Sequence, residues 1–248
     1  MEETTFTKRQ VLRKSAISFA IFILVGFMVY FGYQWVKRQP KIAGAPRPLR
    51  ESLNFNEQVS SRLFDSSRLV KEYPVSAAEK KVRFNGSDGL RDSVNSGTWR
   101  LRVVRSAGDT LQISLSELKA LPKKEIVFDF KCIEGWSQVT HWGGVPMKTF
   151  IDHYRLGPES QLKYMGLQTP DKGYYVGIDM PSALHPQTLL CYEMNGRALP
   201  LREGFPVRLI IPVKYGIKHL KRIGTMFFSN EKPPDFWAER GYDYYAGH

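Results

Sequence analysis

A cysteine set among charged and aromatic residues is the first feature of this sequence that points to chemistry. Cys132 directly follows the alternating segment 125–131 and opens the run CIEGWS at 132–137. The end of a strand, where rigid backbone passes into a loop, often carries functional side chains. A thiolate is a nucleophile and a soft-metal ligand, and a neighbouring cation such as Lys131 favours that form. A buried structural cysteine is the commoner alternative for a lone thiol.

A second segment gathers positive charge behind an apolar stretch. Residues 206–212 are almost wholly apolar, and Lys214, Lys218 and Lys221 follow in a loop that contains Gly216. Backbone amides and convergent cations form anion sites, so phosphate is the ligand that this loop favours. An ordinary solvated basic loop is the alternative.

The composition excludes several other chemistries. The chain has 248 residues, 42% of them hydrophobic and 13% aromatic, which is not the composition of a disordered protein. Two cysteines exclude a disulfide scaffold and a cysteine-rich zinc or iron–sulfur site, and the five histidines lack metal-ligand spacing. Neither nucleotide-binding glycine motif is present. The net charge of +12 is concentrated near an apolar run, where residues 37–50 carry +5, so we expect a membrane surface and no nucleic acid.

Together these segments resemble the sulfite-oxidase superfamily of molybdopterin enzymes. The run CxEGWS at 132–137 is typical of its bacterial periplasmic protein-methionine-sulfoxide reductase branch. The C-terminal signature of the superfamily recurs in order as YEMNG (192–196), LP (199–200), GxPxR (204–208), Pro212 and KYGxKxxK (214–221). The run FWAERGY at 236–242 resembles its ending, and the resemblance extends from about Arg83 to Tyr245.

The resemblance implies one Mo-molybdopterin per chain, with no haem in this chain. Cys132 would ligate molybdenum through its sulfur. The implied cofactor-binding residues are Asn85, Asp88, Gly89, Cys132, Thr169, Arg208, Lys218, His219, Leu220 and Lys221. Glu134, two residues from the metal ligand, is a candidate catalytic proton donor, although a structural glutamate is an equally good interpretation. Trp136, Trp142 and Tyr174 are candidates for the substrate mouth or for aromatic core packing.

Three positions depart from the pattern of the superfamily. Glu203 stands where a neutral asparagine or histidine usually contacts the cofactor. A carboxylate there would either point away from the anionic cofactor or donate a hydrogen bond while protonated. Glu134 and Trp136 replace arginines that hold an oxyanion substrate in true sulfite oxidases, which argues against sulfite as substrate.

Strands are the elements that must position these residues. Alternating patterns predict strands at 98–104 and 125–131, with further strands at 110–113, 162–167, 188–194 and a central one at 206–212. A capping box at 114–117 opens a short helix, and a second helix is expected over 145–154. No regular βαβ alternation appears. We therefore predict an α+β domain over 81–248, with mixed sheets and short helices, of the sulfite-oxidase type that binds molybdopterin.

An uncharged run of 22 residues, 15–36, precedes this domain. At about 1.5 Å per residue a helix of that length spans a hydrocarbon core. Tyr30, Tyr33 and Trp35 near its end are typical of a membrane interface. We predict a basic cytoplasmic N-terminus (1–14), a transmembrane anchor (15–36) and a proline-rich stalk or linker (37–80) with one short helix. A cleaved signal peptide and a buried core helix are the alternatives.

The balance of Lys and Arg around this run does not decide its orientation. Residues 7–13, TKRQVLR, resemble a twin-arginine export signal with Lys in place of the first Arg. A pterin cofactor is inserted into a folded protein in the cytoplasm, which suits export of a folded chain. We predict a single-pass protein of a bacterial inner membrane with a periplasmic catalytic domain.

The resulting functional hypothesis is oxygen-atom transfer that reduces a sulfoxide-type substrate, either a small molecule or a protein-bound group. A membrane haem or quinol-linked partner would supply electrons. One alternative is a non-catalytic, membrane-tethered binding or electron-transfer module on the same fold. Another is a thiol peroxidase that pairs Cys132 with Cys191, although Cys191 lies in an apolar strand and is more simply a core residue.

Overall fold

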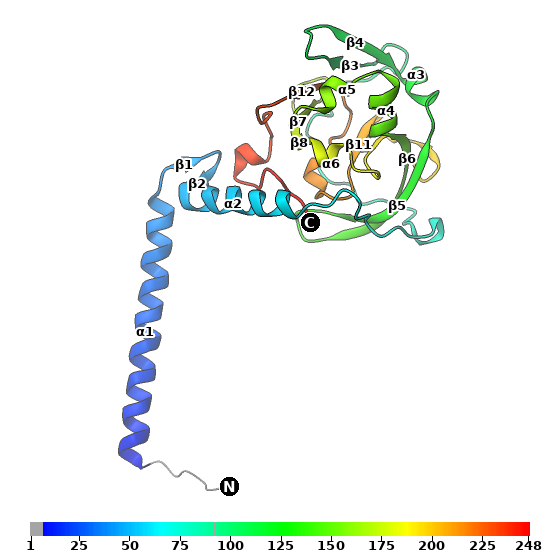
Figure 1. Ribbon diagram of the computed structural model, residues 1–248. Helices are drawn as coiled ribbons and strands as arrows, with labels where there is room; N and C mark the ends of the chain where they lie inside the picture. The colour runs from blue at the N-terminus through cyan, green and yellow to red at the C-terminus, as the bar shows by residue number, and fades with distance from the viewer. Residues whose placement is uncertain (1–6, 92) are drawn as a thin grey trace.

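A long helix stands apart from a domain built on two β-sheets (Figure 1). The computed structural model describes residues 7–91 and 93–248, so the first six residues of the predicted N-terminal segment lie outside the described part. Helix α1, Lys8–Arg38, contains the whole uncharged run, and none of its residues is buried. It is long and apolar enough to cross a membrane. A buried core helix is therefore excluded for this segment.

Short helices and strands form the rest of the chain. The helices are α2 (Arg47–Leu63), α3 (Leu115–Lys119), α4 (Met147–His153), α5 (Gly157–Ser160) and α6 (Met180–Ala183). The strands are β1 (Lys41–Ile42), β2 (Ala45–Pro46), β3 (Arg100–Val104), β4 (Thr110–Ser114), β5 (Lys124–Lys131), β6 (Ser137–Pro146), β7 (Tyr164–Gln168), β8 (Tyr175–Asp179), β9 (Leu189–Met194), β10 (Arg197–Ala198), β11 (Arg208–Ile210) and β12 (Thr225–Ser229). Single 3₁₀ turns cover Val75–Ala77, Leu201–Glu203, Gly216–Lys218 and Ala238–Arg240.

The first sheet carries the cysteine loop. Its strand order is β10-β9-β6-β5, and β11 also pairs with β9. The strands β5 and β6 form an antiparallel hairpin in which Lys131 pairs with Ser137. Residues 132–136 are the turn of this hairpin, so the sequence motif lies at one end of a rigid two-stranded ribbon.

The second sheet is mixed, with the order β4-β3-β12-β7-β8. The strand β12 runs parallel to β3 and antiparallel to β7, which brings the C-terminal part of the chain into the middle of the sheet. The main core lies between the two sheets, and Leu101 and Val103 of β3 are completely buried there. A smaller apolar cluster around Phe128, Phe130 and Trp142 lies against the first sheet. Mixed sheets and short helices confirm the predicted α+β class.

Most predicted elements are present, with informative exceptions. The capping box at Ser114 opens α3, because its hydroxyl accepts from the backbone N–H of Glu117. The predicted helix at 145–154 begins two residues later, after the end of β6. The strands β6, β8 and β12 were not predicted. The strand at 206–212 is wrong as a central strand: β11 covers three residues and pairs with β9 on one side. The apolar residues of 206–212 are buried because they pack into the two core clusters.

The segment after α1 is more ordered than a stalk. The helix α2 has 17 residues and runs across the end of α1 towards the domain (Figure 1). A two-stranded hairpin, β1–β2, makes the connection. The single helix expected within residues 51–79 is therefore present, but it begins at Arg47.

Candidate functional site

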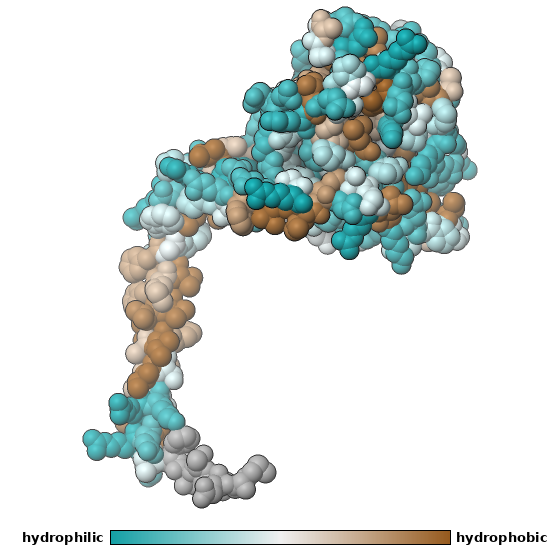
Figure 2. All heavy atoms as spheres, viewed as in Figure 1, coloured by the Kyte–Doolittle hydropathy of each residue, from teal (hydrophilic) through white to brown (hydrophobic). Residues whose placement is uncertain are grey.

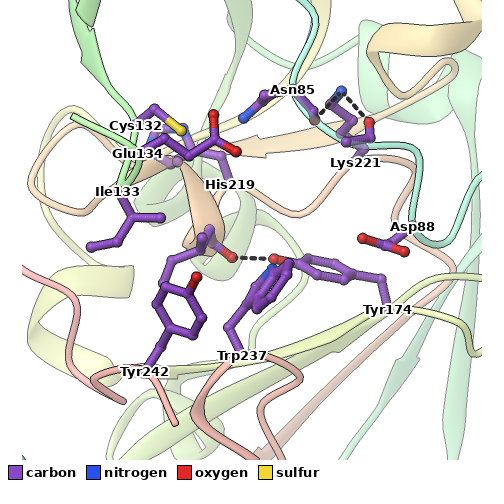
Figure 3. A pocket seen from close by; sticks show the side chains of 13 residues that line it. Asn85, Asp88, Cys132, Ile133, Glu134, Tyr174, His219, Lys221, Trp237 and Tyr242 are labelled. Atoms are coloured by element: carbon purple, nitrogen blue, oxygen red, sulfur yellow. Dashed lines mark hydrogen bonds between the residues drawn. The ribbon is translucent and has the colours of Figure 1, made fainter. Parts of the chain in front are cut away.

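An open cavity of about 120 Å³ lies where the cysteine loop (132–136), the basic loop (213–221) and the C-terminal segment (236–242) meet (Figure 3). Six of the predicted site residues line it: Asn85, Asp88, Cys132, Glu134, His219 and Lys221. They come from three segments that are far apart in the sequence, 85–88, 132–134 and 219–221. The fold thus brings the core of the predicted site to one place.

Cys132 sits in a tight turn that fixes its position. Its backbone N–H donates to the carbonyl of Trp136 at 2.9 Å, and its own carbonyl accepts from Gly135 N–H at 3.1 Å. Gly135 has a φ of +87°, a conformation that glycine adopts without strain. The glycine of the motif therefore allows the turn that points the thiol into the cavity.

The thiol of Cys132 has a raised pKa, mainly because burial penalises the thiolate, and the carboxylate of Glu134 adds to the effect. The hypothesis that Lys131 favours the thiolate is wrong. Neighbouring residues on a strand point to opposite faces, and the Lys131 ammonium lies 3.5 Å from the His248 ring instead. A neutral thiol is a weak nucleophile but can still bind a soft metal, because coordination itself removes the proton.

Glu134 lies beside the Cys132 sulfur at the cavity wall (Figure 3). The indole Nε1 of Trp136 donates to Glu134 Oε2 at 3.0 Å. The Trp136 ring is in turn covered by the Arg83 guanidinium, 4.6 Å from its centre. One carboxylate oxygen is thus held by an indole, and the same carboxylate interacts with the Cys132 thiol. This is not a salt-bridged structural glutamate within the described residues.

Two buried cations and Glu203 form a charge cluster behind the cavity. Glu203 Oε2 lies 3.2 Å from Arg208 Nη1 and 3.8 Å from Lys221 Nζ. The Arg208 guanidinium also stacks on Trp142, 4.6 Å from the ring centre. Glu203 therefore turns towards the two cations to which the resemblance assigns the cofactor.

Lys221 is the cation of this cluster that reaches the cavity. Its ammonium donates to the carbonyls of Asn85 at 2.9 Å, Gly86 at 3.1 Å and Arg202 at 3.3 Å. Burial, together with repulsion from Arg208, lowers the pKa of Lys221 to about 7. A lysine with this pKa gains its proton readily when an anion approaches, which suits a phosphate partner.

His219 lines the cavity as a neutral, fixed ring. Its Nδ1 accepts from the backbone N–H of Ile211, and its Nε2 donates to the carbonyl of Lys214. Burial lowers the pKa of the imidazole to about 3, so the ring is neutral. The ring meets Phe130 edge-on at 4.7 Å. His219 is thus fixed by backbone contacts on both nitrogens.

Five predicted cofactor residues do not line this cavity. Lys218 forms a buried ion pair with Asp235, and Leu220 is a fully buried core residue. The Thr169 hydroxyl is engaged within its own turn, where it donates to Asp171 and accepts from the Tyr174 N–H. Gly89 packs on Thr169, and Arg208 faces a smaller adjoining cavity with Trp136 and Trp142.

Aromatic residues form the opposite wall of the cavity. Tyr174, Trp237 and Tyr242 line it, whereas Trp142 is buried in the core and donates to Thr140. Of the aromatics considered for the mouth, Tyr174 is there and Trp142 is not. Trp237 and Tyr242 were missed as cavity residues. The aromatic run at 236–242 was the available signal, but its place opposite the cysteine loop depends on the tertiary structure.

Cys191 has the surroundings of a core residue. It is fully buried in β9, and its thiol donates to the carbonyls of Gly143 and Glu193. Burial raises the pKa of Cys191 to about 12. Such a thiol does not act as a resolving partner, so the structure does not favour a thiol peroxidase.

The site has the chemical character of one that holds a molybdenum–pterin group. Cys132 offers a soft ligand, and among residues 7–91 and 93–248 no cluster of three His, Cys, Asp or Glu side chains could hold a metal alone. Glu203 Oε1 and Arg208 Nε are buried without a hydrogen-bond partner in the described chain, which marks a place for a polar ligand group. The three charges of Glu203, Arg208 and Lys221 leave one positive excess for an anion.

Comparisons with known proteins agree with this geometry. Residues 88–237 match the family described as the oxidoreductase molybdopterin-binding domain. A candidate protein-methionine-sulfoxide reductase subunit, YedZ1 of Azospira oryzae, is 39% identical over 196 residues, which cover 78% of this chain and 73% of that protein.

A solved structure has a similar fold. The sulfane dehydrogenase SoxCD from Paracoccus pantotrophus matches with a TM-score of 0.51 and 17% identity over 57% of this chain and 40% of that one. The chain therefore spans less than half of that structure, and the likeness concerns the fold alone. The family match covers well over half of the chain, and it includes the cysteine loop and the basic loop. The chain belongs to the oxidoreductase molybdopterin-binding domain family.

Proposed function

We propose that this chain is a membrane-anchored molybdenum–molybdopterin oxidoreductase that reduces a sulfoxide-type substrate by oxygen-atom transfer. The observation that carries the proposal is the cavity that gathers Cys132, Glu134, Asn85 and Lys221 under an aromatic wall. The printed name of the Azospira oryzae relative refers to methionine sulfoxide, which supports this substrate class.

The residues of this chain divide the work of holding the cofactor. Cys132 would ligate the metal, and Arg208 and Lys221 would bind the anionic end of the pterin. Asn85 and Asp88 line the same cavity and offer polar contacts. When bound, the group supplies two-electron redox chemistry and oxygen-atom transfer, which protein side chains alone cannot provide.

The remaining cavity residues handle the substrate and its proton. Glu134 lies at the wall next to Cys132, and the Trp136 indole holds one of its carboxylate oxygens. Reduction of a sulfoxide to a sulfide and water needs two protons and two electrons. Glu134 is placed to deliver a proton to the departing oxygen. Tyr174, Trp237 and Tyr242 exclude water and offer aromatic surface, which binds thioether groups favourably.

The electrons come from a partner protein in the membrane. Helix α1 is exposed along its whole length and apolar enough to span a bilayer, and the relative from Azospira oryzae is named as a subunit. We propose that a haem or quinol-linked membrane protein reduces the site, with the domain on the periplasmic face of a bacterial inner membrane.

The experiment compares the two cysteines. Cys132→Ser should lose bound molybdenum and the reduction of methionine sulfoxide by a reduced dye, because a hydroxyl is a harder and poorer ligand. Cys191→Ser keeps a hydroxyl within reach of the same backbone carbonyls and should retain molybdenum. Normal metal content and turnover in Cys132→Ser would refute the metal assignment. If the unaltered protein binds molybdenum but does not reduce sulfoxides, the proposed substrate class is refuted.

A further inference from the structure

The junction between α1 and the domain is rigid. The buried Arg50 guanidinium donates to four backbone carbonyls: Ile42 and Ala43 of the β1–β2 hairpin, and Ala238 and Tyr242 of the C-terminal segment. Gly44 packs so closely that a Cβ there would lie 2.6 Å from the Arg240 carbonyl carbon. The backbone N–H of Arg47 also donates to Pro40 O at 2.9 Å. The end of α1, the hairpin and the start of α2 therefore form one unit with the domain.

Helix α2 has one face on this unit and another apolar face in the open. Arg50, Leu53 and Glu57 face the protein, and Glu57 accepts from Lys232 at 2.7 Å. Phe55, Val59 and Leu63 follow at intervals of four residues, so they lie along one stripe. Their exposed fractions are 64%, 38% and 78%. Figure 2 shows hydrophobic surface along α2 on the side from which α1 extends.

Positive charge borders this stripe. Arg62, Arg68 and Lys71 are exposed at and beyond the C-terminal end of α2. Lys37, Arg38 and Lys41 lie at the other end, where α1 finishes. An apolar stripe flanked by basic residues is typical of a helix that lies in a membrane interface and contacts anionic lipid headgroups.

We propose that α2 lies on the bilayer surface, with Phe55, Val59 and Leu63 inserted at the boundary between headgroups and acyl chains. The inference rests on the proposed membrane anchoring by α1. The uncharged run ends at Val36, so the end of α1 lies at the depth of the headgroups. The rigid junction holds α2 against that end and hence at the same depth. The stripe fits an anionic lipid surface, because the exposed basic residues at its two ends (Lys37, Arg38, Lys41, Arg62, Arg68, Lys71) outnumber the exposed carboxylates Asp65 and Glu72.

This arrangement has a consequence for the site. Arg50 joins α2 to the carbonyl of Tyr242, whose side chain lines the cavity. The catalytic domain is therefore held against the membrane in one orientation and does not swing on a loose stalk. A membrane-embedded electron donor would always meet the same face of the domain.

The test uses nitroxide labels on the full-length holoenzyme in vesicles of phosphatidylethanolamine and phosphatidylglycerol. Val59→Cys places a label on the stripe, and Gln58→Cys, the adjacent exposed residue on a polar face, is the matched control. Native Cys132 and Cys191 are buried, so the introduced thiols react first. We expect the label at 59 to collide several-fold more with oxygen, relative to a water-soluble nickel chelate, than the label at 58.

Several outcomes separate the possible failures. Equal access of the nickel chelate to 58 and 59 would overturn the interfacial position of α2. A label at Ile23→Cys in α1 tests the anchor itself, and nickel access there would overturn the anchoring on which the inference rests. Protection at 59 that disappears when the protein is diluted with lipid would identify a second copy as the occupant and also overturn the proposal. Weaker protection in neutral phosphatidylcholine supports the role of the basic rim.

Discussion

At the scale of single residues, the charge of the site depends on how burial shifts the pKa of its ionisable side chains. Lys221 and Arg208 are cations that the fold removes from water, and Glu203 is the one described carboxylate beside them. Burial lowers the pKa of both cations. The carboxylate of Glu203 lies beside both cations and balances part of their charge.

Replacing Glu203 with glutamine should have two opposite effects. The cofactor-free protein should lose about 3 kcal/mol of unfolding free energy, because two buried cations are left without their partner. Its affinity for sulfate, used as a phosphate probe, should rise because the competing carboxylate is gone. Urea unfolding and calorimetric titration measure these effects. Glu51→Gln, in an exposed pair with Arg47, is the control and should change neither. A simultaneous loss of stability and of sulfate affinity would contradict the competing role of Glu203.

Anion binding should depend on the protonation of Lys221. The free group has a pKa of about 7, and a bound anion raises that value by favouring the ammonium. Binding therefore takes up a proton above pH 7. Sulfate affinity of the cofactor-free protein should be constant below pH 7 and fall up to about ten-fold per pH unit above it.

Sulfate stays a dianion throughout this range, so the protein alone supplies the pH dependence. Lys221→Arg keeps its charge at every pH and should give a flat profile by the same calorimetric titration. A pH-dependent profile in that variant would assign the effect to another group.

At the scale of elements, the β5–β6 hairpin and the C-terminal segment determine the cavity. The hairpin turn places Cys132 and Glu134, whose spacing is local and therefore visible in the sequence. The C-terminal 3₁₀ turn at Ala238–Arg240 places Trp237 and Tyr242 on the opposite wall. The aromatic wall thus depends on how the segment after β12 is held.

Arg50 should be the residue that holds this segment. Arg50→Met removes four hydrogen bonds to carbonyls of the hairpin and of the C-terminal turn while keeping an unbranched side chain. We expect faster hydrogen exchange at residues 41–46 and 238–242 by mass spectrometry, with little change in the sheets. Arg47→Met, which removes only an exposed ion pair, is the control. Unchanged exchange at 238–242 in Arg50→Met would show that other contacts hold the C-terminal turn.

At the scale of the whole molecule, an apolar helix that we propose spans the membrane, a helix that we propose lies on its surface and a domain of the molybdopterin-binding family follow one another in a single chain. The rigid junction keeps the domain next to the end of α1, so the domain lies on the side of the membrane where α1 ends. Protease added to intact spheroplasts should digest the domain from outside and leave a protected fragment that contains α1, because we place the domain in the periplasm. Digestion after lysis of the spheroplasts serves as the control, because the protease then reaches both sides of the membrane. Complete protection before lysis would place the domain in the cytoplasm.

Local patterns in the sequence predicted much of this protein. The uncharged run predicted α1, alternation predicted β3 and β5, and a capping box predicted α3, because each depends on residues close in the chain. The ordered motifs predicted the family and six of the residues that meet in the cavity. Local signals failed for β8 and β12, whose pairing partners stabilise them from distant parts of the chain.

Only the tertiary structure decided where the charged and aromatic side chains point. Lys131 is next to Cys132 in sequence but lies beside His248, because strand neighbours face opposite sides. Lys218 and Lys221 are three residues apart, yet one pairs with Asp235 and the other reaches the cavity. Glu203 meets Arg208 and Lys221 because removing charges from water is costly unless they are paired. The paired charges are close only in the folded chain, so the sequence pattern does not reveal which partner each charge has.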